Sequence, residues 1–277
     1  MQTAATVVIS HYNAWEPDQL IALLDQVAAI PAGCPFGTRV VVNQAVPRPL
    51  ELPERHRQIE VLYRPNVGYN IGAWDHGWRA GPPTPFYLFL QEECRIFRPG
   101  WLRAFVARAR RPRVGIVGET VAYYNSTWED IVEQEWGSTA TRDYMARLEG
   151  WGVPLGPMAT HLRSLVLCAR REVLERTGGF RSGATKEEAI AVEVAITKQV
   201  EALGLRAEQV ALRPFSFVAH PQWEEDRLQT LSWKWAARRL AGRYLGLARW
   251  QAYRRQRRRR RGEQVWAVEH APPRQES

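Results

Sequence analysis

Residues 6–13 read Thr-Val-Val-Ile-Ser-His-Tyr-Asn, a short β-branched run that ends in polar side chains. A run of this kind is typical of a buried strand in a parallel sheet. The apolar residues that follow it recur at helical spacing, at Leu20, Ile21, Leu23, Leu24, Val27 and Ala28. The sequence therefore opens with a strand and a helix, which is how an α/β fold begins.

Further apolar runs predict the remaining strands, over 39–43, 59–63, 86–90, 114–118 and 165–169. Helices are expected over 170–176 and 186–203, each followed by glycine. The alternation predicts a doubly wound α/β sheet flanked by helices. Its ligands should bind beyond the carboxyl ends of the strands. Between residues 120 and 157 the pattern is too weak to assign elements.

The composition favours one catalytic domain with an appendage. The chain has 277 residues, of which 45% are hydrophobic, enough for one sizeable core. It contains no apolar run near the roughly 18 residues of a membrane-spanning helix, and its start lacks a secretory profile, so we expect a cytoplasmic protein. Cys34, Cys94 and Cys168 are widely spaced and indicate neither a disulfide framework nor a zinc site.

Positive charge is concentrated in one segment. Residues 233–262 hold one Lys and eleven Arg without an acid, and subtracting these twelve charges from the net +9 leaves −3 for the rest. We therefore expect a domain over residues 1–228, a basic amphipathic helix over 229–262 and a disordered tail over 263–277. An Arg-rich helix edged with Trp and Tyr suits an anionic membrane surface. An inert tail and non-specific nucleic-acid binding remain alternatives, and no nucleic-acid motif supports the latter.

Glu92 and Glu93 directly follow the most apolar predicted strand, residues 86–90. At this position their carboxylates would enter the ligand crevice, where a divalent cation bound with a nucleotide diphosphate requires oxygen ligands. The alternative is a solvated acidic loop.

Four segments together resemble the family 2 glycosyltransferases with the GT-A fold. They are the first strand with Ser-His-Tyr-Asn at 10–13, the Asn- and Gly-rich stretch 64–73, the run 89–93 with Pro-Gly at 99–100, and 169–174 leading to Gly-Gly-Phe at 178–180. Their order and spacing follow the family. The resemblance implies a nucleotide-binding, Rossmann-type mixed sheet flanked by helices. It also implies a nucleotide-sugar donor, an inverting single displacement, and a divalent cation (Mn²⁺ or Mg²⁺) on the diphosphate.

The resemblance also implies roles for individual residues. Donor-binding candidates are Ser10, His11, Asn13, Asn43, Asn66, Gly68, Gly72, Gln91 and Glu92. Glu93 and His220 are the candidate metal ligands. Glu193 falls on the position of the catalytic aspartate that takes the acceptor's proton, with Glu188 and Glu187 as rivals. For Gly68 and Gly72 we expect a close approach of the backbone to the diphosphate.

Two positions depart from the family pattern. Asn43 stands where an aspartate usually holds the nucleotide base, and Gln91 stands at the first acidic position of the metal motif. The sequence thus predicts a glycosyltransferase acting on a cell-envelope glycan or a lipid-linked acceptor, peripheral on the inner face of the plasma membrane. A catalytically impaired relative that only binds nucleotide or carbohydrate is the alternative, and a module driven by the basic tail is the third reading.

Overall fold

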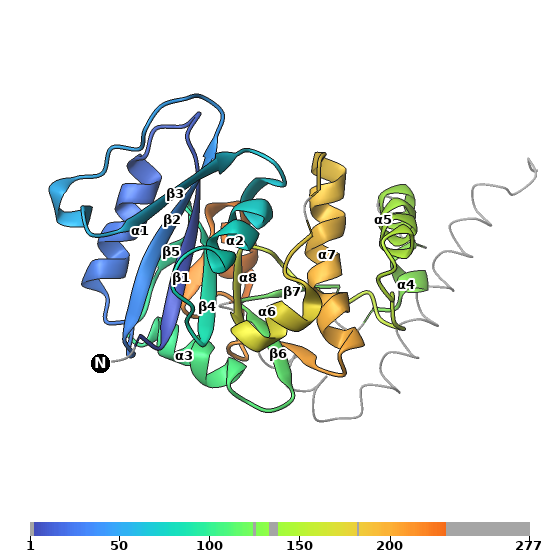
Figure 1. Ribbon diagram of the computed structural model, residues 1–277. Helices are drawn as coiled ribbons and strands as arrows, with labels where there is room; N and C mark the ends of the chain where they lie inside the picture. Colours follow the sequence, from blue (N-terminus) through green and yellow to red (C-terminus); the bar gives the residue numbers. More distant parts are fainter. Residues whose placement is uncertain (1–2, 124–125, 133–137, 182, 231–277) are drawn as a thin grey trace, which may run out of the picture. The chain divides into compact units, whose positions relative to one another are not determined.

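A computed structural model describes residues 3–123, 126–132, 138–181 and 183–230 (Figure 1). The chain divides into two compact units, Met1–Arg227 and Leu228–Ser277. Nearly all described residues belong to the first unit. The predicted basic helix, apart from residues 229 and 230, and the predicted tail over 263–277 lie outside the described residues. None of the described helices combines the length and apolar character that crossing a membrane requires.

A seven-stranded mixed sheet forms the centre of the first unit, in the order β10-β6-β9-β4-β1-β2-β3. The strands are β1 (Ala5–Tyr12), β2 (Phe36–Gln44), β3 (Glu60–Pro65), β4 (Phe86–Gln91), β6 (Val114–Gly118), β9 (Val166–Arg170) and β10 (Arg206–Gln209). All neighbours pair in parallel except β9, which is antiparallel to β4 and β6. The predicted mixed α/β fold is confirmed.

Helices cover both faces of the sheet because successive strand residues point to opposite sides. Val7 and Ile9 of β1 pack in one core with α1 (Asp18–Ala29) and α3 (Trp101–Ala109). Val8 packs in a second core with α2 (Tyr69–Arg79), α6 (Arg171–Thr177) and α7 (Lys186–Ala202). Figure 1 shows α1 and α2 on opposite sides of the strands.

Helices and a strand also form within residues 120–157, for which no elements could be predicted from the sequence. This stretch forms β7 (Val121–Ala122), α4 (Trp128–Val132) and α5 (Ser138–Gly150), followed by β8 (His161–Leu162). A small third core joins α4 and α5 to α7 through Trp128, Ile131, Leu148 and Val194. Most of its buried side chains are aliphatic, and they come from separate segments that include α7, so no single stretch of sequence shows a clear periodicity.

Short elements complete the unit. They are η1 (Glu54–His56), β5 (Arg95–Ile96), β11 (Val218–Ala219), η2 (Pro221–Trp223) and α8 (Glu224–Thr230). β11 pairs antiparallel with β5, just after the end of β4. This pairing brings the residues that follow β11 back to the carboxyl edge of the central sheet.

Candidate functional site

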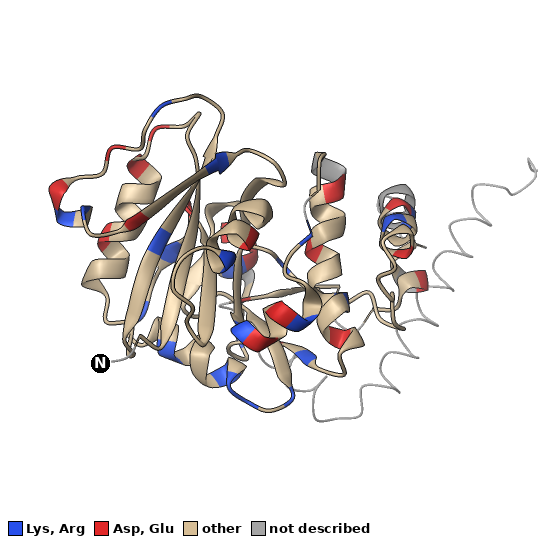
Figure 2. Cartoon of the chain, in the orientation of Figure 1, with Lys and Arg blue, Asp and Glu red and all other residues tan. Residues whose placement is uncertain are grey.

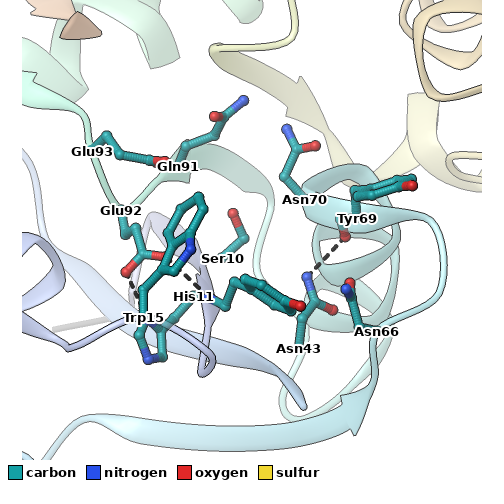
Figure 3. Close-up of a pocket in the computed structure, with 11 residues that line it drawn as sticks. Ser10, His11, Trp15, Asn43, Asn66, Tyr69, Asn70, Gln91, Glu92 and Glu93 are labelled. Atoms are coloured by element: carbon teal, nitrogen blue, oxygen red, sulfur yellow. Dashed lines mark hydrogen bonds and ion pairs between the residues drawn. The ribbon is translucent and has the colours of Figure 1, made fainter. Parts of the chain in front are cut away.

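A pocket of about 320 Å³ opens at the carboxyl ends of β1, β2 and β4. The chain leaves β1 for β2 on one side, while β4 pairs with β1 on the other, so the pocket lies at a switch point of the sheet. Its lining consists of Ser10, His11, Tyr12, Trp15, Asn43, Asn66, Tyr69, Asn70, Gln91, Glu92 and Glu93 (Figure 3). Seven of the predicted site residues therefore lie together, namely Ser10, His11, Asn43, Asn66, Gln91, Glu92 and Glu93.

His11 and Glu92 form the buried side of this pocket. His11 Nδ1 lies 2.5 Å from Glu92 Oε2, and the Tyr12 amide donates to Glu92 Oε1 at 3.0 Å. Both residues are almost inaccessible, at 2% and 3% exposure. Glu92 therefore orients His11 and joins the ends of β1 and β4, instead of lying in a solvated loop.

Both the nitrogen and the oxygen of the Asn43 side-chain amide form hydrogen bonds. Its Nδ2 donates to the Tyr69 carbonyl at 2.9 Å, a contact drawn in Figure 3, and its Oδ1 accepts from Arg64 at 2.7 Å. Arg64 also donates to the Val67 carbonyl at 2.7 Å. Asn43 thus ties the end of β2 to the loop before α2, and Arg64 closes that loop.

Three residues predicted to bind the donor lie outside the lining of the pocket. Gly72 lies inside α2, where an added Cβ would meet the Val67 carbonyl and lie 3.0 Å from Arg64, so its lack of a side chain serves internal packing. Gly68 caps α2 with φ of 77°, a left-handed conformation that favours glycine. Asn13 binds the backbone of residues 45, 46 and 48 and joins two loops.

Glu93 and His220 come together at the edge of the pocket, with His220 Nε2 3.6 Å from Glu93 Oε2. Burial raises the pKa of Glu93, but the nearby His220 outweighs it, and the pKa lies below its ordinary value. His220 Nδ1 accepts the Gln222 amide at 3.1 Å, so the ring hydrogen is on Nε2. Direct metal ligation by Nε2 would require His220 to give up that cap. Among the described residues, no three His, Cys, Asp or Glu side chains form a metal cluster.

Glu119 holds the segment that carries His220. Its carboxylate accepts the amides of Ser216, Phe217 and Val218 at 2.7–2.9 Å. Burial raises the pKa of Glu119 to about 7, although these amides oppose the shift. Glu119 directly follows β6, and no local sequence pattern indicates its long-range role.

Hydrogen bonds through Ser164 connect Glu193 to the pocket. Glu193 Oε2 accepts the Ser164 amide at 2.6 Å and its hydroxyl at 2.5 Å. The Ser164 carbonyl accepts from Gln91 at 2.9 Å and from Asn70 at 3.4 Å, and both of these side chains line the pocket. One residue, Ser164, therefore separates the candidate base from side chains that line the pocket.

The surroundings of Glu193 also favour its ionised form. Burial would raise the pKa of Glu193, but His161 and Ser164 outweigh burial and hold the pKa below its ordinary value. A carboxylate that accepts a proton must first be ionised, so this environment suits a base.

The contacts of Glu188, in contrast, stabilise the start of α7. It receives hydrogen bonds from Arg147 at 3.0 Å and from the Ala184 amide at 2.6 Å, and its own amide donates to Thr185, the N-cap of α7. This arrangement is typical of a helix start. The side chain of Glu187 lies outside the described residues.

Sequence reasoning missed several residues of the site. Trp15 and Tyr69 line the pocket with exposures of 54% and 41%, offering open aromatic surface. Ser164 and His161 belong to the stretch of weak periodicity or its border, and each acts through a partner about 30 residues away in α7. No local pattern signals such pairs.

Charged residues gather mainly on helices and loops, and most of the sheet is uncharged (Figure 2). Against this background, Glu92 and Glu119 stand out, because each is at most 3% exposed and lies at the carboxyl edge of the sheet. The site thus combines buried carboxylates with a polar and aromatic pocket.

The sequence matches no family model. It is 27% identical over 185 residues to the O-antigen biosynthesis protein RfbC of Myxococcus xanthus, a match that covers 59% of this chain and 14% of the relative. The chain thus spans about one seventh of that relative's length. Among solved structures, it is similar to the mannosyltransferase PcManGT of Pyrobaculum calidifontis in complex with GDP-Man and Mn²⁺, with 15% identity and a TM-score of 0.49, covering 76% of this chain and 55% of that one.

Proposed function

We propose that this chain is a glycosyltransferase that moves a sugar from a nucleotide-sugar donor to a cell-envelope glycan or lipid-linked acceptor. The observation that carries the proposal is the connection of Glu193, through Ser164, to Gln91 and Asn70 of the pocket. An ionised carboxylate beside a polar and aromatic pocket at a sheet switch point is an arrangement suited to transfer from a nucleotide donor. The similarity to an O-antigen biosynthesis protein supports the choice of acceptor class.

The proposed reaction is an inverting displacement. The acceptor hydroxyl oxygen forms the new bond to the anomeric carbon, while the bond from that carbon to the diphosphate breaks and its electron pair leaves with the diphosphate. The hydroxyl proton passes to the Glu193 carboxylate. Trp15 and Tyr69 offer flat surfaces to the donor, and Asn66 and Gln91 offer hydrogen-bonding groups.

A divalent cation fits this site through one protein carboxylate. Mg²⁺ in nucleotide sites is typically held by one or two carboxylates together with substrate phosphates and water. Glu93 would supply the carboxylate, and His220, 3.6 Å away, would orient it. When bound, such a cation neutralises negative charge on the diphosphate.

The test is the melting temperature of the full chain with UDP-, GDP- and dTDP-sugars, in Mn²⁺ or EDTA, repeated with Glu93→Ala. We expect one nucleotide to raise the melting temperature in Mn²⁺, and we expect EDTA or Glu93→Ala to remove the rise. A turnover assay with that donor follows. If no donor shifts the melting temperature and none is consumed, the proposal fails.

Binding without turnover is the second candidate function. It is favoured by Gln91 and Asn43, whose side chains are engaged in internal hydrogen bonds. In that case a donor stabilises the protein, yet neither transfer nor donor hydrolysis occurs. Wild-type protein and Glu193→Gln would then both bind the donor, and neither would transfer or hydrolyse it.

A further inference from the structure

The two oxygens of the Glu193 carboxylate have different partners. Oε2 receives both donors of Ser164, at 2.6 and 2.5 Å. Oε1 lies 3.6 Å from Nε2 of His161, a residue with 5% exposure in β8. His161 is therefore the side chain that controls the second oxygen.

The hydrogen position on the His161 ring follows from its other nitrogen. Nδ1 lies 3.0 Å from the Ala159 carbonyl, and a carbonyl oxygen only accepts, so Nδ1 carries a hydrogen. The neighbour of Nε2, the Glu193 carboxylate, also only accepts, so a ring that contacts both groups donates from both nitrogens and makes a charge-assisted contact with Glu193.

The backbone around His161 is anchored to the same helix as Glu193. Thr197 of α7 accepts the Leu162 amide at 3.0 Å, and Lys198 donates to the carbonyls of Met158 and Thr160 at 2.6 and 3.1 Å. Glu193 and Thr197 are four residues apart and share one face of α7. The segment 158–164 is thus fixed along this face, which leaves the ring little freedom to turn.

We propose that His161 is a positioning residue for Glu193: it holds Oε1 while Ser164 holds Oε2, and so fixes the carboxylate in one orientation beside the pocket. This role rests on the proposed transfer reaction. The surrounding segments also carry the Tyr123 ring, in edge contact with His161 at 5.7 Å, the Lys198 ammonium on α7, and Arg163, which pairs with Asp226. None of these is the group that faces Glu193 Oε1.

The first measurement uses wild-type protein and requires no turnover. Two-bond ¹H–¹⁵N correlations of the histidine rings show which ring nitrogens carry hydrogen at the pH of the transfer assay. We expect hydrogen on Nε2 of His161, the nitrogen that faces Glu193. A ring with hydrogen on Nδ1 alone would contradict the proposal, whatever the variants do.

The second measurement follows the Glu193 carboxyl ¹³C signal, identified by its loss in Glu193→Gln. We expect its titration midpoint to rise in His161→Gln, because a positive partner is removed. His76→Gln, a change in α2 away from this pair, should leave it unchanged. A folded His161→Gln protein with the wild-type midpoint overturns the proposal.

Kinetic measurements distinguish failure of the positioning role of His161 from failure of the proposed transfer reaction. His161→Gln should lower kcat about tenfold or more while donor KM stays the same, because misorientation of a base affects the transition state. Equal kcat values in wild type and His161→Gln overturn the positioning role. If wild type transfers no sugar but both NMR results are as expected, the transfer proposal fails and the hold on Glu193 stands.

Discussion

Glu193 and Glu188 lie on the same helix, yet their surroundings give them different roles. Glu193 binds Ser164 beside the pocket, whereas the Glu188 carboxylate binds Arg147 and the Ala184 amide just before α7. We expect Glu193→Gln to lower kcat by about 100-fold or more, since a general base contributes that much. Donor stabilisation should remain.

Glu188→Gln is the matched control, because it makes the same chemical change five residues earlier. It should retain kcat and reduce only the melting temperature. Initial-rate measurements on both variants decide between them. Loss of turnover in Glu188→Gln, with Glu193→Gln active, would reverse the assignment.

The Glu119 carboxyl predicts a pH dependence of stability. Burial raises its folded-state pKa to about 7 from an ordinary value of 4.5, so folding favours the protonated form. Its contribution is fully present below about pH 4.5 and is lost as pH rises through about 7, a change on the order of 3 kcal/mol. Urea unfolding at several pH values should show this fall in wild type relative to Glu119→Gln. Parallel pH profiles for the two proteins would refute it.

At the scale of elements, the packing of α2 on the loop before it predicts an effect of Gly72. A methyl group at Gly72 meets the Val67 carbonyl and Arg64, so Gly72→Ala should lower the free energy of unfolding by about 1–3 kcal/mol. Gly37→Ala in β2 is the control, because no atom lies within 4 Å of its added Cβ. Chemical denaturation of both variants checks this. Equal stability would show that the loop moves to accept the methyl group.

The sequence predicted the strands better than the helices. Runs such as 86–90 are apolar on both faces, and the structure places them in the sheet centre. The helix α2 was missed because Asn70, Gly72 and Gly77 make its sequence read as a loop. The reason for each glycine is a tertiary contact. An added Cβ would meet the Val67 carbonyl at Gly72 and the side chains of Val8 and Val41 at Gly77.

The candidate site, like the fold, could be predicted from the sequence only in part. Residues that follow strands, such as His11, Asn43 and Glu93, could be predicted because strand ends meet at one edge. The partners that determine their chemistry could not. The hydrogen bond between Gln91 and Ser164 spans 73 positions and depends on tertiary structure alone.

At the scale of the whole molecule, the basic segment 233–262 predicts attachment to anionic membranes. Its twelve positive charges contribute on the order of 1 kcal/mol each near such a surface at low salt. We expect the full chain to sediment with phosphatidylserine vesicles and a chain lacking residues 229–277 to stay in the supernatant. The shortened chain should keep its donor-dependent melting shift.

Neutral vesicles and high salt serve as controls, because both weaken electrostatic attraction. Binding by the shortened chain would assign the membrane contact to the first unit. Binding to RNA with the same salt dependence and greater strength would favour the nucleic-acid alternative.

The position of β9 has a consequence for synthesis of the chain. β9 lies between β4 and β6, but it is made after both of them, at residues 166–170. Until these residues leave the ribosome, β4 and β6 each have an open edge, and open edges invite pairing with other chains. Release of a chain shortened before residue 166 should therefore yield aggregates, whereas arrival of β9 closes the edge of β4 and leaves only the far edge of β6 to wait for β10.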